Sequence, residues 1–207
     1  MLKDLFSLVT IVALLFSSCS KSDEEENSDE PQPTKQTAYF GVNLSGAEFG
    51  NVYPGVDGTH YGYPTEKDLD YFKAKGLYLV RFPFRWERVQ HEVNGPLDME
   101  LDMKKIKEVI AEAERIGMYV MLDMHDYCRR NVDGVTCKIS DSGKLTKEHL
   151  ADVWEKIAVE CQMYKNIWGY DIMNEPYGLD KGVWYSTAQA VIDAIRTCLL
   201  YTSDAAA

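Results

Sequence analysis

The sequence is short of positive charge and of long apolar runs. Its 22 Lys and Arg residues stand against 33 Asp and Glu residues, for a formal net charge of −11. A protein that binds nucleic acid must neutralise phosphates, so this composition excludes nucleic acid as a partner. The apolar run at residues 5–16 is too short to span a bilayer.

That short run reads as part of a targeting segment. Lys3 precedes it, and residues 16–19, Phe-Ser-Ser-Cys, resemble a bacterial lipobox. Residues 1–19 therefore predict a lipoprotein signal peptide with Cys19 as the lipidated residue, and an ordinary signal peptide with a chance cysteine is the alternative. Residues 20–37 are acidic and predict a disordered tether. We expect export and lipid anchoring at the outer membrane or cell surface of a Gram-negative bacterium.

The other cysteines fall into three settings. Cys128 and Cys137 lie in one predicted loop and could pair outside the cytosol, but the sequence does not show the geometry that a disulfide needs. Cys161 lies on an apolar helix face and predicts a small buried hydrophobe. Cys198 belongs to an unusual tail.

Strand-like and helix-like segments alternate from residue 38 onwards. We predict strands at 38–44, 77–82, 118–124 and 167–173, with Pro83 ending the second strand. A long ordered loop is expected at 45–64 and a polar loop up to residue 142.

Helices are predicted between these strands. Thr65 and Asp68 form a capping-box pattern, Thr146 caps a later helix, and Gly76 and Gly117 supply helix stops. A final helix is expected from Trp184 to about residue 196. The predicted inner helix faces contain Leu69, Phe72, Ile106, Val109, Ile110, Ala113, Leu150, Val153, Trp154, Ile157, Ala158 and Cys161.

Four βα units in series imply a parallel sheet with right-handed crossovers. A doubly wound sheet and a (β/α)₈ barrel both fit. The Gly-rich phosphate-binding turn of a nucleotide fold is missing after the first strand. Functional-looking residues instead fall at the ends of several strands, at Asn43, Arg81, His125, Asn174 and Glu175. This distribution favours an α/β fold of the (β/α)₈ TIM barrel type, truncated to about its first four βα units.

Four motifs occur in order at these strand ends. Residues 41–46 read Gly-Val-Asn-Leu-Ser-Gly, 81–88 read Arg-Phe-Pro-Phe-Arg-Trp-Glu-Arg, 123–127 read Asp-Met-His-Asp-Tyr, and 174–176 read Asn-Glu-Pro. Alone, Asn-Glu-Pro fits a strand-to-loop turn equally well. The ordered set, across about residues 39–196, resembles glycoside hydrolase family 5, the cellulase family of retaining (β/α)₈ glycosidases. Its phrasing is closest to the endo-β-1,4-glucanases.

The resemblance implies roles for individual residues. Glu175 matches the general acid/base, which needs a raised pKa of the kind that burial would supply. Asn174 matches the residue that binds the sugar 2-hydroxyl, Arg81 the guanidinium that keeps the nucleophile ionised, and His125 a substrate-binding histidine. Tyr127, Trp86 and Trp184 are candidates for stacking on sugar rings, although Trp86 fits the core equally well. The implied substrate-binding set is Arg81, His125, Tyr127, Asn174, Asn43 and Trp86.

The second catalytic carboxylate is not visible. A retaining glycosidase needs it about 5 Å from the first, and the resemblance places it on a seventh strand. Asp123 and Asp126 do not match that position. Residues 198–207 resemble a translated sequencing adapter and break the apolar period of the last helix. We therefore predict a barrel half at 38–197, a non-native tail, and no activity for this fragment alone; a natural terminus is the alternative.

The leading hypothesis is a monomeric, lipid-anchored, endo-acting β-1,4-glucanase that uses no cofactor. Mannan, xyloglucan, mixed-linkage glucan and xylan are alternative substrates on the same scaffold. A non-catalytic glycan-binding lipoprotein is a second class, but binding alone requires neither Asn174 nor Glu175. A metal-dependent hydrolase using Asp123, His125 and Asp126 is a third, and the His-x-His pair typical of such sites is absent from the first strand. We expect no metal.

Overall fold

The computed structural model describes residues 40–140 and 143–203. The predicted signal peptide, Cys19 and the predicted tether lie outside these residues, and so do the last four positions of the predicted tail. Within the described ranges, no helix has both the length and the apolar character needed to cross a membrane.

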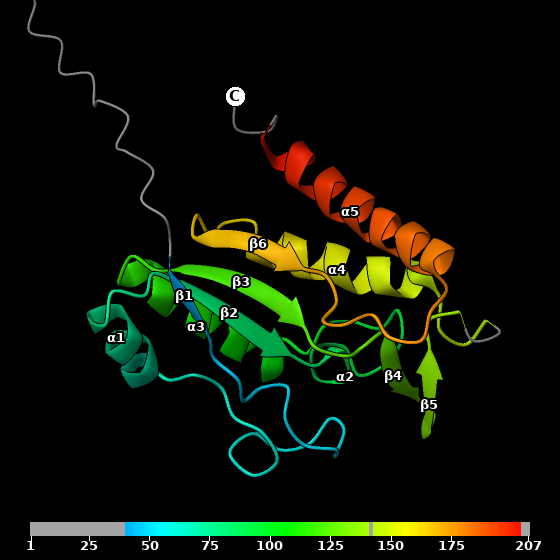
Figure 1. Cartoon of the computed structure of the whole chain (residues 1–207), viewed down its shortest axis with the longest axis horizontal. Helices are drawn as coiled ribbons and strands as arrows, with labels where there is room; N and C mark the ends of the chain where they lie inside the picture. Colours follow the sequence, from blue (N-terminus) through cyan, green and yellow to red (C-terminus); the bar gives the residue numbers. More distant parts are fainter. Residues whose placement is uncertain (1–39, 141–142, 204–207) are drawn as a thin grey trace, which may run out of the picture. The chain divides into compact units, whose positions relative to one another are not determined.

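The described residues form a parallel sheet with the strand order β1-β2-β3-β6 (Figure 1). The strands are β1 (Gly41–Asn43), β2 (Leu79–Phe84), β3 (Tyr119–Met124) and β6 (Ile167–Asp171). The register pairs residue 43 with 81, and residue 123 with both 83 and 171. The predicted succession of parallel strands is confirmed, and the carboxyl ends of the strands meet at one edge.

Helices connect successive strands of this sheet. They are α1 (Glu66–Ala74), α2 (Trp86–Val89), α3 (Asp102–Arg115) and α4 (Lys147–Cys161), and α5 (Lys181–Ser203) follows β6. Figure 1 shows α5 lying against α4. We predicted a break in the apolar period of α5 after residue 197, and this is wrong. Cys198 and Leu199 still pack against the core in succession to Val191 and Ile195, so the helix continues.

Two helix-to-strand corners have the same geometry, as the two glycines predicted. After α1, Gly76 has φ +81° and donates to Lys73 O (3.0 Å), while the next residue donates back to Phe72 O (3.1 Å). After α3, Gly117 has φ +70° and donates to the Glu114 carbonyl (3.0 Å). A positive φ costs glycine least, which is why each helix ends there.

The predicted cap of α1 is also confirmed. The Asp68 carboxylate accepts the backbone N–H of Thr65 (2.8 Å), which satisfies a donor that the helix itself leaves unpaired.

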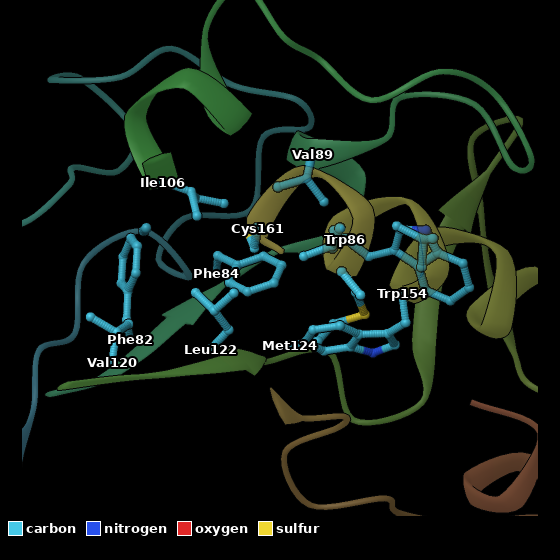
Figure 2. Packing of buried hydrophobic residues seen from close by; sticks show 14 of the residues in the cluster. Phe82, Phe84, Trp86, Val89, Ile106, Val120, Leu122, Met124, Trp154 and Cys161 are labelled. Atoms are coloured by element: carbon cyan, nitrogen blue, oxygen red, sulfur yellow. The ribbon is translucent and has the colours of Figure 1, made fainter. Parts of the chain in front are cut away.

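One face of the sheet is closed by apolar packing. Alternate residues of β2 and β3 point to the helices and are fully buried, and Figure 2 shows them against side chains of α3 and α4. Trp154 ties α4 to the sheet: its ring meets Phe84 and Tyr170 edge-on, and its indole N–H donates to Ile172 O (2.9 Å). Fully burying each such side chain contributes about 1.5–3 kcal/mol. The strand residues of this layer are Val80, Phe82, Phe84, Val120, Leu122 and Met124.

Pro83 lies inside β2, so the prediction that it ends this strand is wrong. Arg81 O accepts from Leu44 N (3.0 Å) on the β1 side, and Phe84 O accepts from His125 N (2.9 Å) on the β3 side. Backbone groups alternate sides along a strand, so Pro83 faces the β1 side, where β1 has already ended. A missing N–H costs nothing at that position.

The predicted polar loop after β3 contains a β-hairpin. Strands β4 (Arg129–Val132) and β5 (Val135–Lys138) pair antiparallel around Asp133 and Gly134, whose φ values are +51° and +81°. Two central residues with positive φ are typical of a tight hairpin turn. Cys128 and Cys137 lie at this hairpin as buried free thiols rather than as a disulfide, and Cys161 is buried as predicted.

The buried side chain of Arg88 makes several of the contacts that hold the long loop between β1 and α1. Arg88 is fully buried and donates to the carbonyls of Ala47, Phe49 and Pro54, the last at 3.1 Å. Its guanidinium also lies 3.7 Å from the centre of the Tyr61 ring. The predicted ordered loop is confirmed, and this buried cation contributes to its order.

Candidate active site

Arg81 is the hub of a polar network at the carboxyl ends of the strands. Its Nε and Nη2 reach Asp171 Oδ2 (3.0 and 2.9 Å), and Nη2 also lies 2.9 Å from Asp123 Oδ2. Nη1 donates to Asn43 Oδ1 and Nη2 to Asn174 Oδ1, both at 2.9 Å. The parallel register places these residues side by side, so three of the predicted site residues meet through one guanidinium.

Asp123 is the buried member of this network. Its side chain is fully buried, and Oδ1 has no hydrogen-bond partner among the described residues. Burial raises the pKa of Asp123 to about 6, while the hydrogen bond from His125 and the charge of Arg81 oppose that rise. The carboxylate therefore depends on Arg81 and His125 to stay ionised near neutral pH.

Asp123, His125 and Asn174 form a chain of hydrogen bonds. His125 Nδ1 lies 2.7 Å from Asp123 Oδ2, and His125 Nε2 lies 3.1 Å from Asn174 Nδ2. An ionised Asp123 assigns the ring proton to Nδ1, so Nε2 accepts from the amide. Both ring nitrogens of His125 are then engaged by protein groups. The amide of Asn174 keeps its second N–H for a ligand hydroxyl.

Glu175 follows Asn174 directly, in a different setting from the one we expected. Its backbone has φ +42°, in the left-handed region that non-glycine residues rarely adopt. Its side chain is exposed, so the predicted burial of this carboxylate does not occur within the described residues. The N–H of Asn174 donates to Met124 O (2.8 Å) and fixes where the turn begins. Left-handed residues of this kind concentrate at functional sites.

Comparison of the chain with known proteins identifies its family. The model of the cellulase family, glycosyl hydrolase family 5, matches residues 32–198. The chain belongs to glycosyl hydrolase family 5.

Named relatives of this family 5 chain are endoglucanases. Endoglucanase EG-II of Hypocrea jecorina is 26% identical over 76% of this chain and 40% of its own length. A probable endo-beta-1,4-glucanase B of Aspergillus oryzae is 30% identical over 76% of this chain and 45% of its own. The chain thus spans less than half the length of these curated relatives.

Solved structures agree with this assignment. The endoglucanase Cel5A of Pseudomonas stutzeri, solved with cellobiose, is 41% identical with a TM-score of 0.69, over 77% of this chain and 46% of that one. An endo-beta-1,4-glucanase of Xanthomonas axonopodis pv. citri, a triple mutant, is 39% identical with a TM-score of 0.71, over 78% and 49%.

Trp86 is placed in the core of the family 5 chain and not at its surface. It opens α2, is fully buried, and donates its indole N–H to Gln90 Oε1 (2.9 Å). The Arg130 guanidinium covers its ring at 4.8 Å. Its faces are unavailable to a sugar, so the core alternative replaces the prediction that Trp86 binds substrate.

Asp126 organises the start of α2. Its two oxygens accept from Arg85 Nη1 (3.0 Å) and from the backbone N–H of Trp86 (2.7 Å). Burial raises the pKa of Asp126 and nearby Glu87 adds to the rise, while Arg85 opposes it. This carboxylate is engaged at the helix, so the metal-dependent alternative loses one of its three proposed ligands.

Several residues near the strand ends were missed by sequence reasoning or placed only loosely. Tyr127 meets the His125 ring edge-on, with 5.3 Å between ring centroids. Tyr177, two residues after Glu175, is 70% exposed, and Arg129 lies 5.1 Å over its ring while donating to its carbonyl (3.0 Å). An exposed aromatic ring held beside the acid suits stacking on a sugar.

Asp171 was missed too. A charged residue inside the otherwise apolar stretch 167–173 was the available signal.

Proposed function

We propose that this chain carries the acid/base half of a retaining endo-β-1,4-glucanase site. The supporting observation is the Arg81 network, which gathers Asn43, Asp123, Asp171 and Asn174 at one strand edge directly before Glu175. The endoglucanase relatives support β-1,4-glucan as substrate, and solved neighbours include XacCel5A in complex with cellopentaose. Non-catalytic glycan binding is disfavoured because it requires neither a general acid nor a 2-hydroxyl donor.

In this proposal Glu175 acts twice. It gives its proton to the glycosidic oxygen while a second carboxylate attacks the anomeric carbon and the glycosidic bond breaks. It then takes a proton from water, whose oxygen attacks the anomeric carbon and releases that carboxylate. Asn174 donates its free N–H to the sugar 2-hydroxyl, and Arg81 keeps the neighbouring carboxylates ionised. Asp123 lies on β3 and Asp171 on β6, whereas the family resemblance places the nucleophile on a seventh strand, so neither is assigned as the nucleophile.

We further propose that β1, β2, β3 and β6 are the first four strands of an eight-stranded barrel. The supporting facts are the family assignment and the share of about half that this chain covers in solved neighbours. Strands standing opposite β1 and β6 would cover the exposed carboxylate of Glu175 and supply the nucleophile. The chain as given is then expected to hydrolyse nothing, and turnover by it would contradict the missing-nucleophile argument.

A chimera tests the proposal directly. Residues 40–197 replace the matching half of the Pseudomonas stutzeri endoglucanase, and release of reducing ends is measured on cellopentaose, mannopentaose and xylopentaose. We expect turnover on cellopentaose, about 10³-fold lower in Glu175→Gln because general acid catalysis is lost. Glu155→Gln, an exposed acid on α4, is the matched control and keeps full rate.

The other outcomes of the chimera are equally informative. Faster turnover of mannopentaose or xylopentaose than of cellopentaose would make mannan or xylan the substrate of the same scaffold. A folded chimera that binds cellopentaose without turnover favours the glycan-binding alternative. Unchanged turnover in Glu175→Gln would overturn the role of Glu175.

We also propose, from residues 16–19 alone, that the exported protein is lipid-anchored through Cys19. Labelled palmitate should enter the wild-type protein when it is expressed in a Gram-negative host. A Cys19→Ser variant that is labelled equally would rule out anchoring at Cys19.

A further inference from the structure

Three metal-ligating side chains meet at the connection between α2 and α3, away from the residues of the Arg81 network. His91, Asp98 and Asp102 each offer one ligand atom, and these atoms all lie within 4.8 Å of one another. His91 Nε2 is 3.3 Å from Asp98 Oδ2. Two ligands of a tetrahedral zinc ion, each roughly 2.1 Å from the metal, stand roughly 3.4 Å apart. The distance between His91 and Asp98 is close to this separation, and the third ligand atom lies within 4.8 Å of both.

Asp102 carries the observation that calls for a ligand. It is 1% exposed, and its Oδ1 accepts the hydroxyls of Tyr61 (2.8 Å) and Tyr63 (2.6 Å). Its Oδ2 is buried and has no hydrogen-bond partner within the described ranges. A buried carboxylate oxygen left unpaired costs about 1–3 kcal/mol or more, and a cation would remove that cost.

The two carboxylate oxygens of Asp98 also have different surroundings. Asp98 Oδ1 accepts the backbone N–H groups of Glu100 and Leu101, both at 3.1 Å. The Asp98 backbone is itself fixed, because its N–H donates to Val89 O (2.8 Å) and its carbonyl accepts from Met103 (2.9 Å). Each acid therefore has one oxygen held by the protein, while Asp98 Oδ2 faces His91 and Asp102 Oδ2 is left without a partner among the described residues. Metal ligands are oriented by neighbouring groups in this way.

We propose that His91, Asp98 and Asp102 bind one divalent transition-metal ion, with Zn²⁺ as the best match. One neutral imidazole and two carboxylates make a neutral complex with a divalent ion, and imidazole favours zinc over calcium or magnesium. Access is open, since the His91 side chain is 48% exposed and lines an open cavity of about 290 Å³ with Glu92 and Asp98. Solvent completes the coordination. Through Asp102, the ion would link the α2–α3 connection to Tyr61 and Tyr63 of the β1–α1 loop. This proposal differs from our expectation from the sequence that the protein binds no metal.

Zinc titration of the full chain tests the site. After chelation and dialysis, calorimetry with Zn²⁺ alone should give one binding site per chain. His91→Ala and Asp98→Asn should each weaken binding about 10- to 100-fold or more. Asp98→Asn keeps the Oδ1 acceptor, so the backbone turn survives. Asp133→Asn, at an exposed acid in the β4–β5 turn, is the matched control and should bind as the wild type does.

Thermal unfolding supplies the second measurement. Zn²⁺ should raise the unfolding midpoint of the wild type and of Asp133→Asn, because it binds the native state, and at the same zinc concentration should raise that of His91→Ala by clearly less. Circular dichroism checks that the variants are folded. A wild type that takes up no zinc overturns the proposal. Binding of equal strength in His91→Ala marks an adventitious ion only and overturns it as well.

Discussion

The two faces of β2 and β3 differ in that only one of them carries charged residues, although the residues of the two faces alternate along the same strands. Toward the helices, every side chain of these strands is apolar and fully buried. On the other face, the side chain of Arg81 on β2 is 28% exposed, and Asp123 on β3 is buried beside charged groups. Asp171, with a side chain that is 32% exposed, extends this polar group onto β6. The apolar face contributes stability through the apolar surface area that it buries and the side-chain volume that it fills. The polar face depends on which partner each group has, so single substitutions should act differently on the two.

The largest effect should come from the apolar face. Phe82→Ala removes a fully buried ring and leaves a cavity, so we expect it to lower the free energy of unfolding by about 3–5 kcal/mol in urea denaturation. Met121→Ala, on the opposite face of the neighbouring strand and half-buried, is the matched control, at roughly 1 kcal/mol. Equal losses would mean that the two faces do not differ as described.

Arg81→Met breaks the polar face. It leaves Asp123 buried without its cation, and we expect a loss of about 3 kcal/mol in the same measurement. Arg81→Lys keeps the charge without the two-pronged geometry and should lose roughly 1 kcal/mol. Adding Asp123→Asn to Arg81→Met should restore part of the loss, because the two residues are coupled. Strict additivity in this double-mutant cycle would refute the coupling.

The pH dependence of stability in Asp123→Asn tests the role of this buried carboxylate. With a folded pKa of about 6, above that of an unfolded Asp, the native state binds more protons between pH 4 and 6. The contribution of Asp123 to stability is therefore present at low pH and lost as pH rises through 6, by about 3 kcal/mol. The stability difference between wild type and Asp123→Asn should follow this curve. A constant difference from pH 4 to 7 would contradict it.

Much of the fold was readable from the sequence because local signals agreed with the global pattern. The capping pair Thr65 and Asp68 and the corner glycines at 76 and 117 each act through their own backbone, so neighbouring context does not change them. The β4–β5 hairpin was missed although Asp133-Gly134 between valines is a hairpin signal. Its two strands are mostly polar and lack the alternation of apolar and polar residues by which a strand is recognised in a sequence.

The candidate site was predictable in position but not in pairing. Strand ends located Asn43, Arg81 and Asn174 correctly at one edge. That His125 and Asn174 bind each other depends on rotamers and on the turn at Glu175, which no periodicity encodes. The prediction that Trp86 binds substrate failed because only Arg85 separates the end of β2 from the start of α2. This turn places the indole in the core and not at the strand edge.

The buried guanidinium of Arg88 has a consequence for how this protein can change over generations. It grips the β1–α1 loop through main-chain carbonyls, which every amino acid possesses. Replacing side chains on the loop's outer surface should therefore leave these Arg88 contacts in place. Gly46 and Gly50 are exceptions, since a Cβ there would meet a carbonyl oxygen at 2.6 and 2.5 Å. Arg88 thus holds this segment through contacts that do not depend on the identity of the segment's exposed side chains.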